Sequence, residues 1–489
     1  MVPEVLRRQA GRWRNIPRAQ RRTVRFVAAS TVAGLVVATG AVAAAGPWDS
    51  GQRKAERDRA AAAARAGGER HAAGGPSSGS GSAPPVLGAL GPGRPPARAA
   101  LAAALEPLLQ DSALGSTHAA SVVDAQSGDE LYGTGQDVAY TPASTIKLAT
   151  AAAALCALGP EHRIATTVVA SGSDGIVLVG GGDPTLTALP AQGEGPRFAS
   201  LRDLADATAK ALKARGTNRT KLAYDTSRYS GPVLHSIGPN DNIAPVTALM
   251  VDEGRLDGSD KGPAERSADP AGDAARTFAG LLHERGVEVD GDPAEAHADA
   301  SAQRIATVSS APLSALVERA LTNSDNDIAE ALARQTALAS GQPVSFEGAA
   351  KAVTDRLGRL GLPSGPARIA DGSGLDRADQ VPAALLSRIL ARAADPAHPE
   401  LRPLLTGLPV AGFTGTLRDR YASGDGKGVV RAKTGTLTGV NTLAGTVVDA
   451  DGRLLAFAFM AGGTADPDAA QRALDHLAST LAGCGCRTG

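Results

Sequence analysis

The sequence TPASTIKLATAAAALCAL, residues 141–158, decides the fold of this 489-residue chain. Pro142 and Ser144 are typical of a helix start, and the nearly all-apolar run from Leu148 to Leu158 predicts a helix that is buried on most of its sides. Ser144 and Lys147 are three residues apart, so they share one face of this helix and the lysine amine can reach the serine hydroxyl.

The pairing of Ser144 with Lys147 has a chemical rationale. A lysine in an apolar, partly desolvated pocket has a lowered pKa and can take a proton near neutral pH. Such a base makes the serine nucleophilic, and the helix N-terminus supplies N–H groups and a positive dipole end that stabilise an oxyanion. The S-x-x-K motif alone is also explained by a capping serine and a solvated first-turn lysine.

A second motif, SDN at residues 324–326, lies in a short turn between two predicted helices, residues 313–322 and 327–339. By itself, this turn is explained most simply as a helix N-cap. A third motif, KTG at residues 433–435, lies on a predicted strand, where a glycine can also mark a bulge. The motifs S-x-x-K, S-x-N and K-T-G each occur once, in that order, and their combination is far more specific than any one of them.

The order and setting of the three motifs resemble those of the serine penicillin-recognising enzymes. The chain is similar to the D-alanyl-D-alanine carboxypeptidase/endopeptidases of the DacB type, which are low-molecular-weight class C penicillin-binding proteins of peptidase family S13. Two further phrases carry this resemblance, LVGGGDPTL at residues 178–186 and DGSGL at residues 371–375. The resemblance covers roughly residues 99–482 and departs from the family at Asp376, where a serine is more common.

The fold class expected is α+β, with an antiparallel sheet packed by helices. Strands are predicted at residues 428–436, 441–448 and 454–461, and a final helix at residues 466–481. Because 176 residues separate Lys147 from Ser324, an inserted domain is expected at residues 161–304. The penicillin-binding catalytic domain is then discontinuous, built from residues 99–160 and 305–489.

The resemblance implies a serine-type D-Ala-D-Ala carboxypeptidase that cleaves peptidoglycan stem peptides and is acylated by β-lactam antibiotics. Ser144 is expected to attack the carbonyl of the penultimate D-Ala, with Lys147 as the base. Ser324 and Asn326 are expected to relay the proton to the leaving D-Ala and to hold the substrate amide.

The third motif is expected to bind substrate. Lys433 and Thr434 would hold the terminal carboxylate, which suits one cation and one hydroxyl, and Gly435 lies between them and Thr436. The backbone N–H groups of Ser144 and Thr436 would form the oxyanion hole.

Two further residues are candidates for substrate binding through the resemblance alone. Asp225 and Arg377 are similar to the pair that grips the diaminopimelate side chain of the stem peptide in relatives. A surface-turn aspartate and a solvated arginine are the simpler alternatives.

Two other functions are compatible with some of these features. A serine β-lactamase carries the same three motifs, but no E-x-x-L-N segment lies between the first two, and the long insertion argues against it. A non-catalytic envelope scaffold is the other alternative, although every motif side chain is intact. The sequence does not decide between carboxypeptidase and endopeptidase activity.

Composition excludes several classes. Fifty basic residues balance fifty acidic ones, which argues against a nucleic-acid-binding protein. The eight histidines are scattered singly and no Cys/His cluster has zinc spacing, so no structural metal is expected. No cofactor is expected either. Three cysteines are too few for a disulfide scaffold. Because the resemblance implies that the first and last helices pack on one sheet, a disulfide from Cys156 to Cys484 or Cys486 is expected in an exported protein. The alternatives are a local bond between Cys484 and Cys486, which would need a strained ring, and a free Cys156 that is simply a small buried apolar residue.

The N-terminal part predicts export. A basic segment, residues 1–25, precedes an uncharged run, residues 26–45, whose length at roughly 1.5 Å per residue matches a bilayer core of about 30 Å. A single-span membrane anchor is expected, with a cleaved signal peptide at the A-V-A site of residues 41–43 as the alternative. Either one places the remainder in the extracytoplasmic cell envelope.

Residues 46–98 are rich in Gly, Ala, Ser and Pro and predict a flexible linker. Within it, GPSSG at residues 75–79 matches the G-x-S-x-G nucleophile motif, but no predicted strand precedes it and no predicted helix follows it. We interpret this match as a coincidence that arises from the Gly- and Ser-rich composition of the segment.

Overall fold

The computed structural model describes residues 95–190, 198–362 and 365–485. The central feature is a five-stranded sheet with the strand order β11-β12-β13-β1-β2, in which every neighbouring pair is antiparallel. Its strands are β1 (Thr117–Asp124), β2 (Glu130–Thr134), β11 (Arg431–Leu437), β12 (Val440–Val448) and β13 (Leu454–Gly462). The three predicted C-terminal strands are therefore confirmed, with bounds shifted by up to three residues.

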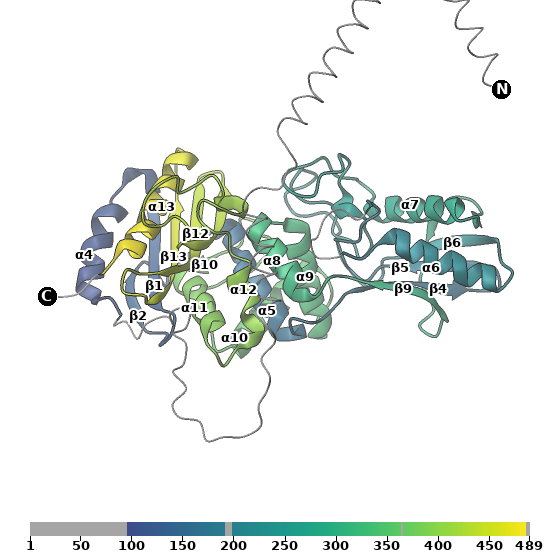
Figure 1. The fold of residues 1–489 in the computed structure, drawn as a ribbon, viewed down its shortest axis with the longest axis horizontal. Coiled ribbons are helices and arrows are strands. Elements are labelled where there is room, and N and C mark those ends of the chain that lie inside the picture. The colour runs from purple at the N-terminus through teal and green to yellow at the C-terminus, as the bar shows by residue number, and fades with distance from the viewer. Residues whose placement is uncertain (1–94, 191–197, 363–364, 486–489) are drawn as a thin grey trace, which may run out of the picture. The chain divides into compact units, whose positions relative to one another are not determined.

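Helices cover both faces of this sheet, which is why β12 and β13 are buried along nearly their whole length (Figure 1). Alternate side chains of β13 enter two different cores: Ala456, Ala458 and Met460 enter one, and Leu455, Phe457 and Phe459 the other. The first core is completed by α5 (Lys147–Leu158), α8 (Leu313–Asn323), α9 (Asn326–Ala339), α10 (Phe346–Arg359), α11 (Ala383–Ala394) and α12 (Pro403–Thr406). The second core is completed by α4 (Arg98–Leu109) and α13 (Pro467–Gly483).

The predicted buried helix is confirmed in α5, whose residues from Lys147 to Leu155 are all buried. Its many alanines let neighbouring helices approach closely. Short elements complete this part of the chain: β3 (Ala139–Tyr140), β10 (Val381–Pro382), η1 (Ser112–Leu114), η2 (Ala143–Ile146), η4 (Pro399–Leu401) and η5 (Gly415–Leu417). Strands β3 and β10 pair with each other in a separate two-stranded ladder.

A second sheet with its own hydrophobic core lies between the first two motifs in the sequence. Its strands are β4 (Ala165–Ser171), β5 (Gly175–Val179), β6 (Arg219–Asp225), β7 (Glu288–Val289), β8 (Ala294–Glu295) and β9 (Arg304–Ser309). Two amphipathic helices pack on it, α6 (Leu201–Ala214) and α7 (Pro270–Glu284), and η3 (Asp252–Gly254) lies between them in the sequence. Strand β9 crosses the boundary expected after residue 304 and pairs with β4.

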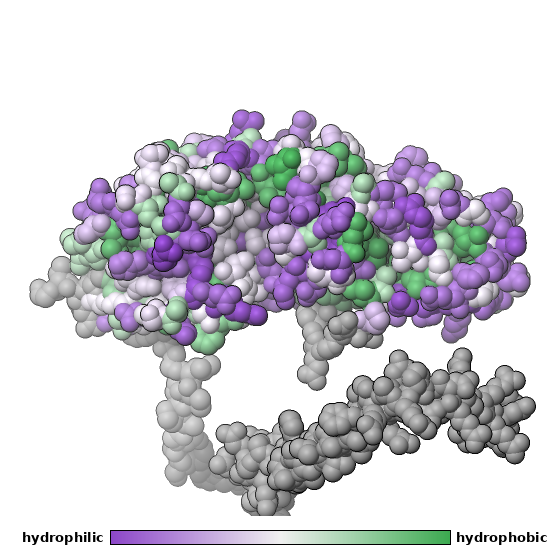
Figure 2. Space-filling model, turned by 90° about the horizontal axis from the view of Figure 1, so that it is seen from above, coloured by the Kyte–Doolittle hydropathy of each residue, from purple (hydrophilic) through white to green (hydrophobic). Residues whose placement is uncertain are grey.

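The face of the molecule in Figure 2 is mixed in character, with polar side chains between small apolar patches. This distribution accompanies a formal net charge of zero.

The expected long-range disulfide is wrong. Cys156 is a free thiol, whereas Cys484 is disulfide-bonded. Cys156 packs against the core that contains α5 and α10, and Cys484 belongs to the core on the opposite face of the sheet. The sheet therefore separates the two thiols, so the distance limits of a disulfide cannot be met.

Among the helices of the described residues, none is both long and apolar enough to cross a bilayer. The predicted anchor at residues 26–45, the basic segment before it and almost all of the predicted linker lie outside the described residues.

Asp124 at the end of β1 and Arg453 before β13 form a bidentate ion pair, in which the carboxylate is fully buried and the guanidinium is partly exposed. Burial by itself would raise the pKa of Asp124, but the hydrogen bonds from Arg453 and from the backbone of Ser127 and Gln126 outweigh it and lower the pKa. We expect Arg453→Ala to reduce the free energy of unfolding by about 3 kcal/mol, because a buried carboxylate loses its cation.

Chemical denaturation measures this change. The matched control is Arg219→Ala, which removes an exposed ion pair to Asp290 at 2.9 Å and should cost less than about 1 kcal/mol. If the two variants lost the same free energy of unfolding, the Asp124–Arg453 pair would contribute no more to stability than an exposed ion pair, which would contradict this prediction.

Candidate active site

Ser144 lies on a tight turn that is fixed to the central sheet. The turn, η2, begins at Ala143, whose φ of 48° is in the left-handed region. The carbonyl of Pro142 accepts hydrogen bonds from the hydroxyls of Thr145 and Thr442, each at 2.7 Å, and Thr442 belongs to β12. The sequence predicted that Ser144 starts the α-helix. Instead, Ser144 lies on one turn of 3₁₀ helix that precedes α5.

Lys147 is the first residue of α5 and is only 1% exposed. Its Nζ atom donates three hydrogen bonds, to Ser144 Oγ at 3.0 Å, to Asn326 Oδ1 at 2.6 Å and to the carbonyl of Ser373 at 2.6 Å. Burial lowers the pKa of Lys147 to about 8. Nearby carboxylates act in the opposite direction and raise this pKa, Asp371 most strongly, but burial outweighs them. A neutral amine at this position can take the proton of the Ser144 hydroxyl.

The S-x-N motif lies where α8 ends and α9 begins. Ser324 ends α8 with a φ of 58°, and Asp325 caps α9 by accepting a hydrogen bond from the N–H of Ile328 at 3.0 Å. Asn326 accepts from Lys147 through Oδ1 and donates through Nδ2 to the carbonyl of Asn242 at 2.9 Å. The capping explanation is correct for Asp325, while Ser324 and Asn326 face the two lysines.

Lys433 on β11 is the second buried cation of the site and is fully enclosed. Its Nζ atom donates to Ser324 Oγ at 2.9 Å and to the carbonyl of Thr434 at 2.6 Å. Burial, together with the positive charge of Lys147, holds the pKa of Lys433 well below its ordinary value. The Thr434 hydroxyl donates to the hydroxyl of Thr416 at 2.9 Å, which places a further hydroxyl at this end of the site.

Two glycines allow the backbone to close around Ser144. A Cβ atom on Gly435 would lie 2.2 Å from Thr442 Oγ1 and 2.7 Å from the carbonyl oxygen of Pro142. Gly374 has a φ of +84°, and a Cβ atom there would lie 2.0 Å from the carbonyl oxygen of Ala143. Glycine is required at both positions because strand β11 and the 371–375 loop touch the Ser144 turn.

The structure does not bring Asp225 and Arg377 together. Asp225 ends β6, where its carboxylate accepts hydrogen bonds from the N–H groups of Ser227 at 2.7 Å and Ala298 at 2.7 Å. Arg377 donates to the carbonyl of Thr438 at 2.7 Å, beside the turn between β11 and β12. No ion pair joins these two described side chains, and their shared grip on a diamino acid stays a prediction.

Sequence reasoning did not assign a role to the Ser373 carbonyl or to Thr416. Ser373 belongs to the DGSGL phrase, and Thr416 to the sequence G-T-L at residues 415–417, but a side-chain motif does not reveal which backbone oxygen faces the site. The glycines at positions 372 and 374 were the one sequence signal for the Ser373 contact, because glycines so placed indicate that the backbone of this loop closely approaches another segment.

Two groups of buried side chains place three candidate metal-ligating atoms within 4.8 Å of one another. The groups are His235, Glu330 and Asp371, and Glu253, Asp325 and Asp327. Three arginines pair with acids of the second group: Arg255, Arg266 and Arg319. In the first group, Asp371 already accepts hydrogen bonds from His235 and from backbone N–H groups. We interpret both groups as internal networks.

A serine paired with a buried lysine, an S-x-N turn and a K-T-G edge strand, arranged around one centre, define a serine penicillin-recognising enzyme. A sequence profile of the D-Ala-D-Ala carboxypeptidase 3 (S13) family matches residues 101–259 and 256–481. The chain belongs to this family, and its expected fold and enzyme class, a serine-type D-Ala-D-Ala carboxypeptidase, are thereby confirmed.

Individual relatives agree with this assignment. A carboxypeptidase of Mycobacterium tuberculosis is 39% identical over 408 residues, covering 80% of this chain and 86% of the relative. Carboxypeptidase DacB of Mycolicibacterium smegmatis is 39% identical over 405 residues, covering 80% of this chain and 85% of the relative. The crystal structure of penicillin-binding protein 4 (dacB) from Haemophilus influenzae has the same fold, with a TM-score of 0.64 at 23% identity over 78% of this chain and 98% of that chain.

We expect Gly435→Ala to disrupt the Ser144 turn, because its methyl group would displace the Pro142 carbonyl or Thr442. Overpacking of this kind costs about 1–3 kcal/mol of stability, and displacement of the nucleophile should reduce acylation roughly 100-fold. Thermal melting and the rate of labelling by a fluorescent penicillin measure the two effects.

Gly365→Ala is the matched control, because a Cβ atom there meets no other atom within 4 Å. A Gly435→Ala variant that is acylated as fast as this control would show that the close contact does not position Ser144.

Proposed function

We propose that this enzyme hydrolyses the terminal D-Ala-D-Ala bond of peptidoglycan stem peptides through an acyl-enzyme on Ser144. The observation that carries the proposal is the 3.0 Å contact between Ser144 Oγ and the Nζ atom of Lys147, a buried lysine whose pKa is lowered to about 8. Family membership supports the substrate class, and the residue roles are inferred from the geometry.

In the acylation step, Ser144 Oγ attacks the carbonyl carbon of the penultimate D-Ala while its proton passes to the neutral amine of Lys147. The backbone N–H groups of Ser144 and Thr436 are the proposed donors to the oxyanion. Collapse of the tetrahedral intermediate breaks the C–N bond and releases D-Ala, whose nitrogen must gain a proton.

Ser324 is suited to relay to that nitrogen the proton that Lys147 took from Ser144, which returns the Lys147 amine to its neutral form. Its Oγ atom accepts a hydrogen bond from Lys433, so its own hydroxyl hydrogen is available to the leaving nitrogen. Asn326, which is held between Lys147 and the Asn242 carbonyl, is fixed in one amide orientation and can hold the substrate amide.

The substrate carboxylate is proposed to bind beside Lys433 and the hydroxyls of Thr434 and Thr416. A cation and two hydroxyls match the charge and hydrogen-bonding capacity of a carboxylate. In deacylation the neutral Lys147 amine takes a proton from the water that attacks the ester, and returns it to Ser144 Oγ as the ester bond breaks.

A β-lactam offers the same serine a strained amide, and we propose that it acylates Ser144. The Haemophilus influenzae protein has been crystallised in complex with a β-lactam. A serine β-lactamase would turn the antibiotic over steadily, whereas the proposed enzyme would give a burst of labelling without sustained hydrolysis. Endopeptidase activity requires only that the leaving amine be the side-chain amine of the diamino acid of a cross-linked neighbouring stem peptide, and an assay on a cross-linked dimer measures it.

Ser144→Ala tests the proposed nucleophile. We expect it to abolish both D-Ala release from a stem pentapeptide and covalent labelling by a fluorescent penicillin, because no acyl-enzyme can form. Ser340→Ala, at the C-cap of α9, is the matched serine control and should retain both activities. Undiminished labelling of Ser144→Ala would refute the assignment of the nucleophile, and labelling of the wild type without D-Ala release would refute the proposed substrate.

We also propose that residues 26–45 anchor the enzyme in the membrane, with the catalytic part in the extracytoplasmic cell envelope. The length of the uncharged run and the arginines before it support this placement. The expected result is co-sedimentation of the mature protein with membranes, with residues 1–45 intact. A mature N-terminus at or near Ala44 would show that a signal peptide is cleaved and would remove the anchor.

A further inference from the structure

The loop of residues 371–374 presents two successive carbonyl groups to the catalytic helix. The carbonyl of Ser373 accepts a hydrogen bond from Lys147 Nζ at 2.6 Å, and that of Gly372 accepts from the hydroxyl of Thr150 at 2.8 Å. Lys147 and Thr150 are one helical turn apart on α5. The position of this loop therefore decides where the lysine amine can lie.

Two buried carboxylates hold the N–H groups of the same loop. Glu330 on α9 accepts hydrogen bonds from Gly372 N and Ser373 N, both at 2.9 Å, through its Oε1 atom. Asp371 accepts from Ser373 N at 3.0 Å and from Gly374 N at 2.6 Å through Oδ1. The peptide units of the loop are thus fixed from both sides, with their N–H groups on carboxylates and their carbonyls on α5.

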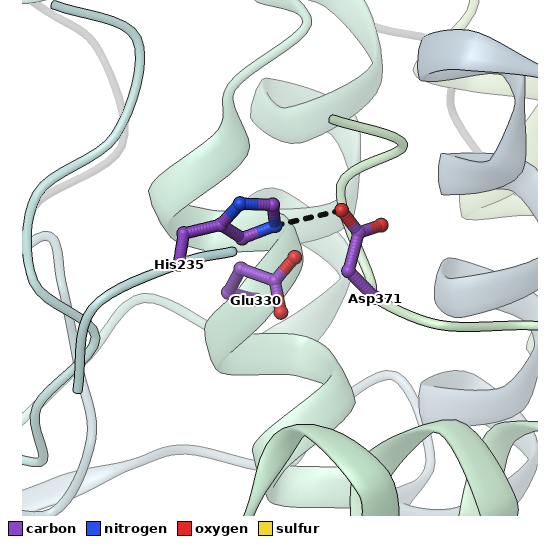
Figure 3. A group of neighbouring side chains, drawn as sticks. All are labelled: His235, Glu330 and Asp371. Atoms are coloured by element: carbon purple, nitrogen blue, oxygen red, sulfur yellow. Dashed lines mark hydrogen bonds and ion pairs between the residues drawn. The ribbon is translucent and has the colours of Figure 1, made fainter. Parts of the chain in front are cut away.

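Asp371 is in turn held by the inserted part of the chain. His235 Nε2 lies 2.8 Å from Asp371 Oδ2, and both side chains are buried (Figure 3). The His235 ring meets Phe346 edge to face, with centroids 5.4 Å apart, which fixes its orientation. Figure 3 shows the Glu330 carboxylate between the histidine ring and Asp371, on the helix that passes behind both.

We infer that Glu330 and the His235–Asp371 pair are positioning residues for the catalytic lysine, and that the inserted segment contributes to catalysis through His235. They do not contact substrate; they fix the loop whose Ser373 carbonyl holds Lys147 Nζ. This inference rests on the proposed role of Lys147 as base and adds to it the residues that set the base's position and charge.

A bound metal ion is the alternative use of the same three side chains. Their candidate ligand atoms lie within 4.8 Å of one another. However, the Asp371 carboxylate already accepts hydrogen bonds from His235 and from the N–H groups of Ser373, Gly374 and Asp376, and Glu330 Oε1 accepts two more. Of this group's carboxylate oxygens, only Glu330 Oε2 is without a hydrogen-bond partner, which favours a proton-linked network over a coordination shell.

The charge of Glu330 should raise the pKa of Lys147. Four carboxylates raise the pKa of the lysine against the dominant effect of burial: Asp371, Asp325, Glu330 and Asp379. Lys433 is the other lysine of the site, and burial together with the charge of Lys147 lowers its own pKa. Burial, and then the neighbouring Asp371 charge, raise the pKa of Glu330 to about 7, so this carboxyl becomes charged in the neutral range. Removal of that charge should lower the pKa of Lys147.

The pH dependence of acylation tests the inference. Because the neutral amine is the active form, the wild-type labelling rate with a fluorescent penicillin should rise with pH to a plateau, with a midpoint near the Lys147 pKa of about 8. Glu330→Gln keeps a carbonyl oxygen for the two N–H groups and should retain most of the plateau, while the midpoint moves to lower pH by up to about 1 unit. Glu330→Ala frees the loop and should lower the plateau roughly 10- to 100-fold.

Gln335→Ala is the matched control. Gln335 is a buried residue of the same helix that donates to the carbonyl of Gly181 at 2.8 Å and does not contact the loop. Its loss should lower the melting temperature without moving the midpoint of the pH profile. His235→Ala should lower the plateau, and His235→Gln, whose amide can donate to Asp371, should recover most of the loss.

The outcomes separate this inference from the proposed function. Labelling of Ser144→Ala refutes the nucleophile, whatever the Glu330 variants do. If Ser144→Ala is inactive but both Glu330 variants match Gln335→Ala in midpoint and plateau, the positioning role is wrong. Loss of wild-type acylation on treatment with EDTA, with recovery on addition of Zn²⁺, would replace the hydrogen-bonded network with a metal site.

Discussion

Two lysines buried within one site are the constraint on which the rest of the structure depends. Lys147 and Lys433 both lose their hydration, which lowers the pKa of each, and the positive charge of Lys147 lowers the pKa of Lys433 further. Burial of an ammonium group is tolerated only where acceptors replace water. Each of the three sequence motifs supplies such an acceptor: Ser144 and Asn326 accept from Lys147, and Ser324 and the carbonyl of Thr434 accept from Lys433. The motifs are thus one hydrogen-bonded unit that binds two cations before any substrate arrives.

The architecture follows from the need to bring these three motifs to one place. Helix α5 carries Lys147, the α8–α9 junction carries Asn326, and β11 at the edge of the sheet carries Lys433. Small side chains permit the close approach: alanines along α5, and glycines at positions 374 and 435 where one backbone touches another. The larger apolar side chains of β13 enter the opposite core, where no chemistry requires close approach.

The sequence predicted the parts of this site that depend on side-chain identity and periodicity. It placed Lys147 on a buried helix and the K-T-G motif on a strand, because apolar spacing and motif order are local signals, but it did not predict the 3₁₀ turn that holds Ser144 before that helix. It did not predict the Ser373 carbonyl as a partner of Lys147, since a backbone acceptor leaves no mark in side-chain identity. The disulfide expectation failed because packing on one sheet does not say which face a helix covers, and Cys156 and Cys484 lie in cores on opposite faces.

The inserted part of the chain is joined to the catalytic centre at two points that differ in chemistry. The carbonyl of Asn242 orients the Asn326 amide, and His235 binds the carboxylate that fixes the loop behind Lys147. A long insertion costs little in loop-closure entropy, so its length alone would not require any contact with the site. The inserted segment thus contacts Asn326 and also the 371–374 loop that holds Lys147. A shift of this segment would therefore move both the proposed base and the groups of the proton relay. The insertion is therefore part of the catalytic geometry, and its removal should cost activity as well as stability.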